Sequence, residues 1–148
     1  MKEKKDGILP TNNDPIKFWK NFRLGTELHI SGSLIYNALH SFDQIEYFYY
    51  EHDVFEFLYS LSIGLERLEK IVVILTEHDE EIDQEEFEKT LITHNHLELL
   101  KRIKKKHTIN LGKQHVKLLQ FISDFYRYAI VGITSNQFMK KIKIYMDS

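Results

Sequence analysis

The chain has 148 residues, enough for one domain, and 43% of them are hydrophobic, too many for a disordered chain. It has no cysteine, which excludes disulfides and thiolate metal ligands, and its six glycines and two prolines are too few for the turns of a many-stranded β fold. No apolar run approaches the roughly 20 residues of a membrane helix, and the polar start lacks the apolar core of a secretory signal. We therefore expect a cytoplasmic, mainly helical protein that does not bind a membrane.

The formal net charge of −2 conceals a division along the chain. Residues 99–148 contain eleven basic and two acidic side chains, whereas residues 1–98 contain nine basic and twenty acidic ones. The acidic excess is greatest between Glu77 and Glu88, where eight of twelve residues are carboxylates. Such a division is typical of a polyanion-binding segment beside an acidic one. It equally suits a solvated acidic loop that packs near a solvated basic helix.

Residues 1–13 are predicted to be a loosely ordered lead, and residues 14–148 to form a single domain. The pair Asp14-Pro15 can begin a helix, because aspartate caps helices and proline suits the first helical position. Gly25 is a plausible end of this short helix, and residues 26–50 predict a second one.

The clearest periodicity covers residues 53–76, where hydrophobic side chains recur every three or four positions. Gly64 lies in the middle of this predicted helix and costs it about 1 kcal/mol relative to alanine. Close approach of a neighbouring backbone would explain the glycine. Glu66 and Lys70 stand one turn apart, in the order that favours an ion pair.

The acidic segment interrupts this pattern, and residues 87–92 predict either a short helix or a loop docked by its apolar side chains. Residues 93–96 are typical of a helix cap, and the helix they begin extends over about 97–106. Residues 113–131 predict a further helix, and residues 134–146 a last amphipathic segment. Four or five helices with short connections predict an all-α, up-down helical bundle.

The apolar stripes of these helices also predict the buried side chains. The predicted core consists of Phe55, Leu58, Leu65, Leu68, Val72, Leu75, Leu97, Leu100, Ile103, Leu119, Ile122 and Phe125. Residues 42–59 carry more aromatic side chains than one buried helix face uses. Because Tyr and Phe are enriched in interfaces, we expect the surplus to form the contact of a homodimer.

Two histidines, His94 and His96, lie two residues apart near a predicted helix start. On a helix their side chains would diverge, so this spacing suits a loop or strand better. Metal binding is one interpretation, and a structural or solvent-facing role is the one we favour. We predict no metal site and no cofactor.

Arg102 and His107 are separated by four residues, three of them lysines. A guanidinium and an imidazole at this separation can reach one phosphate if the helix breaks between them. The arginine would hold phosphate oxygens, and the histidine would move a proton, as cleavage of RNA without a metal requires. The alternative is a basic helix end that caps its own carbonyl groups.

The segment Gly64-Leu-Glu-Arg-Leu-Glu-Lys70, followed by Thr93-His-Asn-His-Leu-Glu-Leu-Leu100, resembles HEPN domains (higher eukaryotes and prokaryotes nucleotide-binding). The resemblance covers about residues 50–130 and implies a bundle of four or five helices. Many HEPN members are metal-independent ribonucleases of toxin–antitoxin and antiviral defence systems. Their Arg-x4–6-His motif forms one site across a homodimer, which implies Arg102 and His107 as catalytic residues here.

Other HEPN members lack that motif and act as partners, often of nucleotidyltransferases. The resemblance therefore implies RNA as a ligand and an antitoxin or a nucleotidyltransferase as a protein partner. Our leading hypothesis is a HEPN-like RNA-binding protein that could act as a ribonuclease. The predicted RNA-binding residues are Lys101, Lys104, Lys105, Lys106, Lys113, Lys117 and Arg127. The alternative is a non-catalytic helical dimerisation or interaction module, or an accessory subunit of a nucleotidyltransferase.

Overall fold

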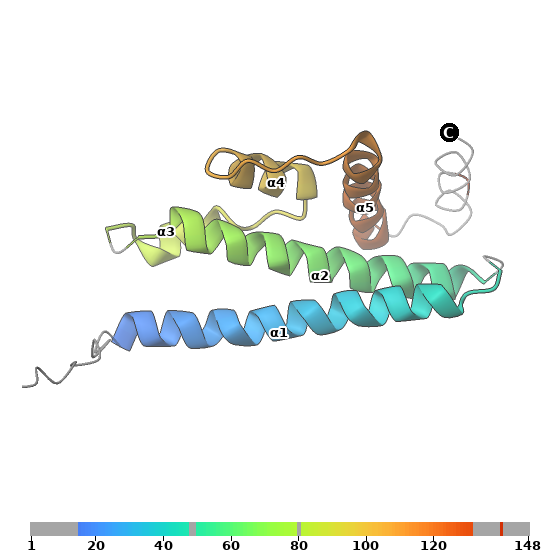
Figure 1. Cartoon of the computed structure of the whole chain (residues 1–148), viewed down its shortest axis with the longest axis horizontal. Coiled ribbons are helices and arrows are strands. Elements are labelled where there is room, and N and C mark those ends of the chain that lie inside the picture. Colours follow the sequence, from blue (N-terminus) through green and yellow to red (C-terminus); the bar gives the residue numbers. More distant parts are fainter. Residues whose placement is uncertain (1–14, 48–49, 80, 132–139, 141–148) are drawn as a thin grey trace, which may run out of the picture.

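A computed structural model describes residues 15–47, 50–79, 81–131 and 140, and all regular structure within these ranges is helical (Figure 1). This confirms the predicted all-α helical bundle. Among the described helices, none combines the length and the apolar character that a membrane crossing requires. The helices are α1 (Pro15–Gln44), α2 (Glu51–Glu77), α3 (Gln84–Lys89), α4 (His96–Lys104) and α5 (Lys113–Val131).

The first helix differs from the prediction, because α1 is one continuous helix of 30 residues and not two. It does not end at Gly25, and it ends at Gln44 rather than near Tyr50. A β-carbon added at Gly25 would have no neighbour within 4 Å, so no close contact needs this glycine. In Figure 1, α1 lies antiparallel to α2 along nearly its whole length. Packing against α2 outweighs the roughly 1 kcal/mol that a helical glycine costs.

α1 approaches α2 closely at Gly64, as the position of this glycine in the predicted helix suggests. A β-carbon there would lie 2.8 Å from Ile35 Cγ1 and 3.1 Å from the Ile35 backbone nitrogen. The buried Ser31 hydroxyl donates a 2.8 Å hydrogen bond to the Gly64 carbonyl oxygen. The prediction that a neighbouring backbone explains this glycine is confirmed.

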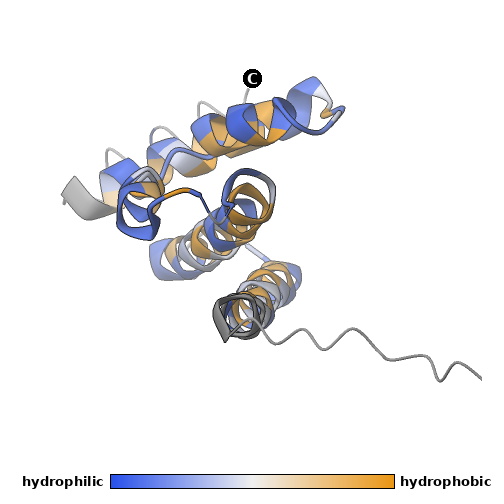
Figure 2. Cartoon of the chain, turned by 90° about the vertical axis from the view of Figure 1, so that its left-hand side faces the viewer, coloured by the Kyte–Doolittle hydropathy of each residue, from blue (hydrophilic) through white to orange (hydrophobic). Residues whose placement is uncertain are grey.

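The central helix of the bundle is α2, which contacts α1, α4 and α5. Figure 1 shows α5 nearly end-on while α1 and α2 lie lengthwise, and Figure 2 shows α5 lengthwise, so α5 runs across the α1–α2 pair. Hydrophobic residues concentrate on the sides of the helices that face one another (Figure 2). Leu61 packs with Ala38 of α1 and Ile122 of α5, whereas Val73 packs with Leu99 of α4.

The core prediction is partly right. The buried members of the predicted set are Leu58, Leu100, Ile103, Ile122 and Phe125. Phe55 and Leu75 are exposed, at 42% and 61% of their surface. Because α2 packs against neighbours on more than one side, its buried positions do not form a single stripe. The prediction assumed one stripe along the helix, and it therefore placed Phe55 and Leu75 in the core wrongly. The remaining five predicted core residues are half-buried.

The acidic segment contains the short helix α3, which covers residues 87–89 of the predicted 87–92, and Leu91 packs on the core from the turn after it, so both predicted alternatives are right in part. Asp83 caps it, with its carboxylate accepting a 2.9 Å hydrogen bond from the Glu86 backbone N–H. Phe87 is buried against Val73, and this contact docks the segment on the end of α2. The predicted last amphipathic segment, 134–146, lies outside the described residues apart from Lys140, and so does the predicted lead, 1–13.

Candidate functional site

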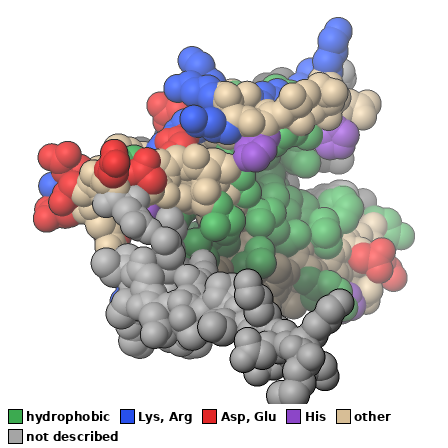
Figure 3. Space-filling view, turned by 60° about the vertical axis from the view of Figure 1, so that its left-hand side comes forward, with side chains coloured by type: hydrophobic (Ala, Val, Ile, Leu, Met, Phe, Trp, Pro, Cys, Tyr) green, Lys and Arg blue, Asp and Glu red, His purple; other side chains and the backbone are tan. Residues whose placement is uncertain are grey.

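The seven predicted RNA-binding side chains are all exposed. They occupy α4, the connection after it, and α5, and none forms an ion pair with a carboxylate of the described residues. Figure 3 shows most Lys and Arg side chains along one edge of the molecule, with a few acidic side chains beside them and a larger acidic group further away. The basic third of the sequence therefore forms a largely basic edge, which meets the acidic segment at the Arg102–Glu77 ion pair.

Arg102 is the exception in this basic segment, because its guanidinium is already engaged. Its Nε and Nη2 donate to the two carboxylate oxygens of Glu77 at 2.6–3.2 Å, and its Nη1 donates to the Thr90 carbonyl oxygen at 2.9 Å. The guanidinium also lies 5.9 Å from the centre of the Phe87 ring. Hydrogen bonding to Arg102 lowers the pKa of Glu77, with burial opposing it. Arg102 thus ties α4 to the ends of α2 and α3.

His107 lies in the turn after α4, where its side chain is exposed. Its backbone N–H donates to the Ile103 carbonyl oxygen at 3.0 Å, which continues the helical turn. No contact among the described residues joins the imidazole to the guanidinium of Arg102. The joint role of the two residues in catalysis stays a prediction.

His96 is fully buried and has a structural environment. Its Nδ1 lies 2.7 Å from Glu69 Oε2 and its Nε2 lies 3.3 Å from Ser62 Oγ. Its backbone N–H donates to Ser123 Oγ at 3.0 Å. Burial raises the pKa of Glu69, and the hydrogen bond to His96 opposes that rise. The Glu69 carboxylate and the Ser62 hydroxyl thus provide a partner for each ring nitrogen of this buried histidine.

His94 points the other way and is accessible. Its Nδ1 lies 2.9 Å from Glu66 Oε2, while Glu66 Oε1 accepts from Lys70 Nζ at 2.6 Å, which confirms the predicted pair. The imidazole stacks on the ring of Tyr126, with 4.1 Å between centroids. Burial and the nearby Glu66 raise the pKa of Tyr126, so its hydroxyl is protonated at neutral pH. The carboxylate of Glu66 and the ring of Tyr126 together fix the His94 imidazole in place.

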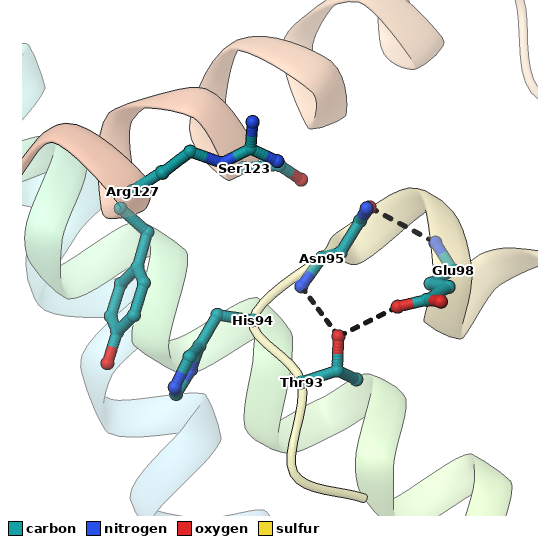
Figure 4. Close-up of a pocket in the computed structure, with 7 residues that line it drawn as sticks. Thr93, His94, Asn95, Glu98, Ser123 and Arg127 are labelled. Carbon is teal, nitrogen blue, oxygen red and sulfur yellow. Dashed lines mark hydrogen bonds between the residues drawn. The ribbon is translucent and has the colours of Figure 1, made fainter.

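His94 belongs to a pocket of about 410 Å³ between the start of α4 and α5 (Figure 4). The Asn95 side chain caps α4 by accepting from the backbone N–H groups of Leu97 and Glu98, as the cap prediction for this segment implies. The Thr93 hydroxyl donates to Glu98 Oε2 at 2.9 Å. In Figure 4 the Arg127 side chain extends from α5 toward the α4 side of the pocket. The lining residues are Thr93, His94, Asn95, Glu98, Ser123, Tyr126 and Arg127.

This pocket was not predicted from the sequence, although part of its signal is visible there. Glu66 and Glu69 lie one turn apart on a helix, and His94 and His96 alternate in an extended segment. Such spacings let two carboxylates meet two imidazoles, as they do in the structure. Arg127 is exposed and pairs with neither Glu66 nor Glu69, whose carboxylates bind His94 and His96.

Within the described ranges, no three His, Asp or Glu side chains gather in an arrangement that could hold a metal ion. No protein-family model matches the sequence, and neither a curated protein nor a solved structure matches the chain. The resemblance to HEPN domains therefore stays a prediction that rests on short sequence motifs.

Proposed function

We propose that this protein binds single-stranded RNA, as a HEPN-like domain would, through the basic surface formed by α4, residues 105–112 and α5. The observation that carries the proposal is that the seven cations of this surface are exposed and have no carboxylate partner among the described residues. Unpaired lysines and arginines on one face attract phosphates, and each contact gains free energy by releasing a counterion.

Lys104, Lys105 and Lys106 form the densest part of this surface, at the exposed end of α4. An RNA strand that runs along α4 would meet all three lysines. The loop after α4 would leave the RNA backbone accessible to them. The Glu77 carboxylate, whose pKa is lowered by Arg102 and further by Lys105 and Lys106, is already paired with that arginine and so opposes an approaching phosphate only weakly.

The test is the affinity for a fluorescent single-stranded RNA as a function of salt concentration. Replacing Lys104, Lys105 and Lys106 by Glu should weaken binding, and it should reduce the slope of log K against log salt by about 2, for three lost phosphate contacts. The matched control compares two single variants. Lys105→Glu should weaken binding, whereas Lys89→Glu, at an exposed position on α3, makes the same charge change and should not. Unchanged affinity of the triple variant would contradict the proposal.

Cleavage of the bound RNA by Arg102 and His107 is a further step that the HEPN resemblance implies. A phosphate that used Arg102 would compete with Glu77 and Thr90 for the guanidinium. Binding is therefore the conclusion that the geometry supports best, and cleavage has its own test. An active enzyme should yield 2′,3′-cyclic phosphate ends in the presence of EDTA, and His107→Ala should abolish them without weakening binding.

Self-association is a second candidate property, favoured by a different surface. Tyr36, Tyr47, Tyr50 and Tyr59 are exposed on α1, on α2 and between them, at 45–69% of their surface. Tyrosines supply large contact areas at interfaces and are costly to leave in water in such number. Light scattering at high micromolar concentration should give twice the chain mass, and a monomer would count against the homodimer.

A further inference from the structure

The pocket beside α5 contains an unused donor and an unused acceptor. Arg127 forms no hydrogen bond or ion pair with the rest of the described chain, and its side chain is exposed. Glu98 is exposed as well, and only one of its two carboxylate oxygens, Oε2, has a partner, the Thr93 hydroxyl. Figure 4 shows the two residues reaching the pocket from different helices, Arg127 from α5 and Glu98 from α4.

The pocket also has an aromatic wall. His94 and Tyr126 stack on each other at 4.1 Å, and both line the cavity. A 2.9 Å contact between His94 Nδ1 and Glu66 Oε2 holds the imidazole in place, so this wall is preorganised. The volume of about 410 Å³ is in the range of small-molecule sites. Proteins that bind single-stranded RNA typically stack a base on such a wall and read its edge with polar side chains.

We propose that this pocket binds one unpaired base of the RNA and selects guanine. The inference rests on the proposed function and adds a base preference to it. Guanine presents two adjacent donors, N1–H and the N2 amino group, which match the two oxygens of a carboxylate such as Glu98. Its O6 and N7 are acceptors that match the guanidinium of Arg127.

The other bases match this pair of side chains less well. Uracil places two carbonyl oxygens beside its one donor, and these would face the Glu98 carboxylate. Adenine and cytosine each offer a single amino group, next to an acceptor nitrogen. The lysines of the basic surface supply no such discrimination, because contacts to phosphate carry no sequence information.

The position of the pocket suits a base on a strand that the basic surface holds. Glu98 is one helical turn before Lys101, and both are exposed on α4. A phosphate bound at Lys101 would therefore lie close to a base in the pocket. Binding and selection would use neighbouring parts of one surface.

The test compares a short oligouridine RNA with the same RNA carrying one guanosine. We expect the wild-type protein to prefer the guanosine RNA by about tenfold, the effect of one well-made set of base contacts. Glu98→Gln should abolish this preference and leave the salt dependence unchanged, because the phosphate contacts remain. The matched control is Glu88→Gln on α3, another exposed glutamate, which should keep the preference.

Arg127→Gln provides a second variant, and the absence of a partner for Arg127 among the described residues makes a folding defect unexpected. It too should lose the preference. Equal affinity of the wild-type protein for both RNAs would overturn the guanine site and leave the proposed RNA binding standing. A preference that survives both Glu98→Gln and Arg127→Gln would also overturn it. Failure to bind either RNA would instead contradict the proposed function.

Discussion

Replacing Gly64 by alanine tests the close packing of α1 on α2. The added methyl carbon would lie 2.8 Å from Ile35 Cγ1, 3.1 Å from the Ile35 backbone nitrogen and 3.1 Å from Leu34 Cβ. The latter two atoms belong to or adjoin the backbone of α1, so the helix itself must move. Overpacking of this kind costs about 1–3 kcal/mol, and the gain in helix propensity returns about 1 kcal/mol. We expect Gly64→Ala to lower the free energy of unfolding by about 1 kcal/mol.

Gly32→Ala is the matched control, because Gly32 is helical, exposed and has nothing within 4 Å of an added β-carbon. Its free energy of unfolding should rise by about 1 kcal/mol, since only the propensity term acts. Urea titrations of the two variants should therefore differ by about 2 kcal/mol, in opposite directions from the wild type. A Gly64→Ala protein as stable as Gly32→Ala would refute the close approach of the two helices.

Three further predictions concern the polar contacts. His96→Ala should lower the free energy of unfolding by about 2–4 kcal/mol in urea titrations, because it leaves Glu69 buried without its donor and opens a cavity. Arg102→Ala should cost about 1–2 kcal/mol at neutral pH by the same measurement. Arg102 lowers the pKa of Glu77 below its usual value of 4.5. The stability that the ion pair contributes is therefore fully present above pH 4.5, and it is lost as the pH falls through the lower pKa of the folded state. The destabilisation by Arg102→Ala should accordingly shrink well below pH 4.5. His107→Ala should change the free energy of unfolding by less than about 0.5 kcal/mol, because its side chain is exposed.

Local sequence signals predicted the features that neighbouring residues determine. The periodicity of residues 53–76 and 113–131 gave α2 and α5 to within two residues at each end. The segment before Leu97 was correctly interpreted as a cap, since the Asn95 side chain can reach the first backbone N–H groups of its own helix.

Features that depend on distant residues were not predictable in the same way. The local sequence at Gly25 predicts a helix end, but α1 continues through this residue and lies along α2. The guanidinium of Arg102 is held by Glu77, 25 residues earlier, and no local pattern indicates this pairing. The shared phosphate site that the motif Arg102-x4-His107 predicts stays a prediction, and the pocket around His94 and Arg127 is built from different elements that no local pattern brings together.

The central claim is that RNA binds the surface formed by α4, residues 105–112 and α5. Hydrogen–deuterium exchange of the intact chain, measured with and without a single-stranded RNA, tests it most directly because it maps the contact along the backbone. The account predicts that added RNA slows exchange at residues 101–117 and leaves exchange around the exposed tyrosines Tyr36, Tyr47, Tyr50 and Tyr59 unchanged. Protection confined to the segments around those tyrosines, or no change anywhere at saturating RNA, would contradict it.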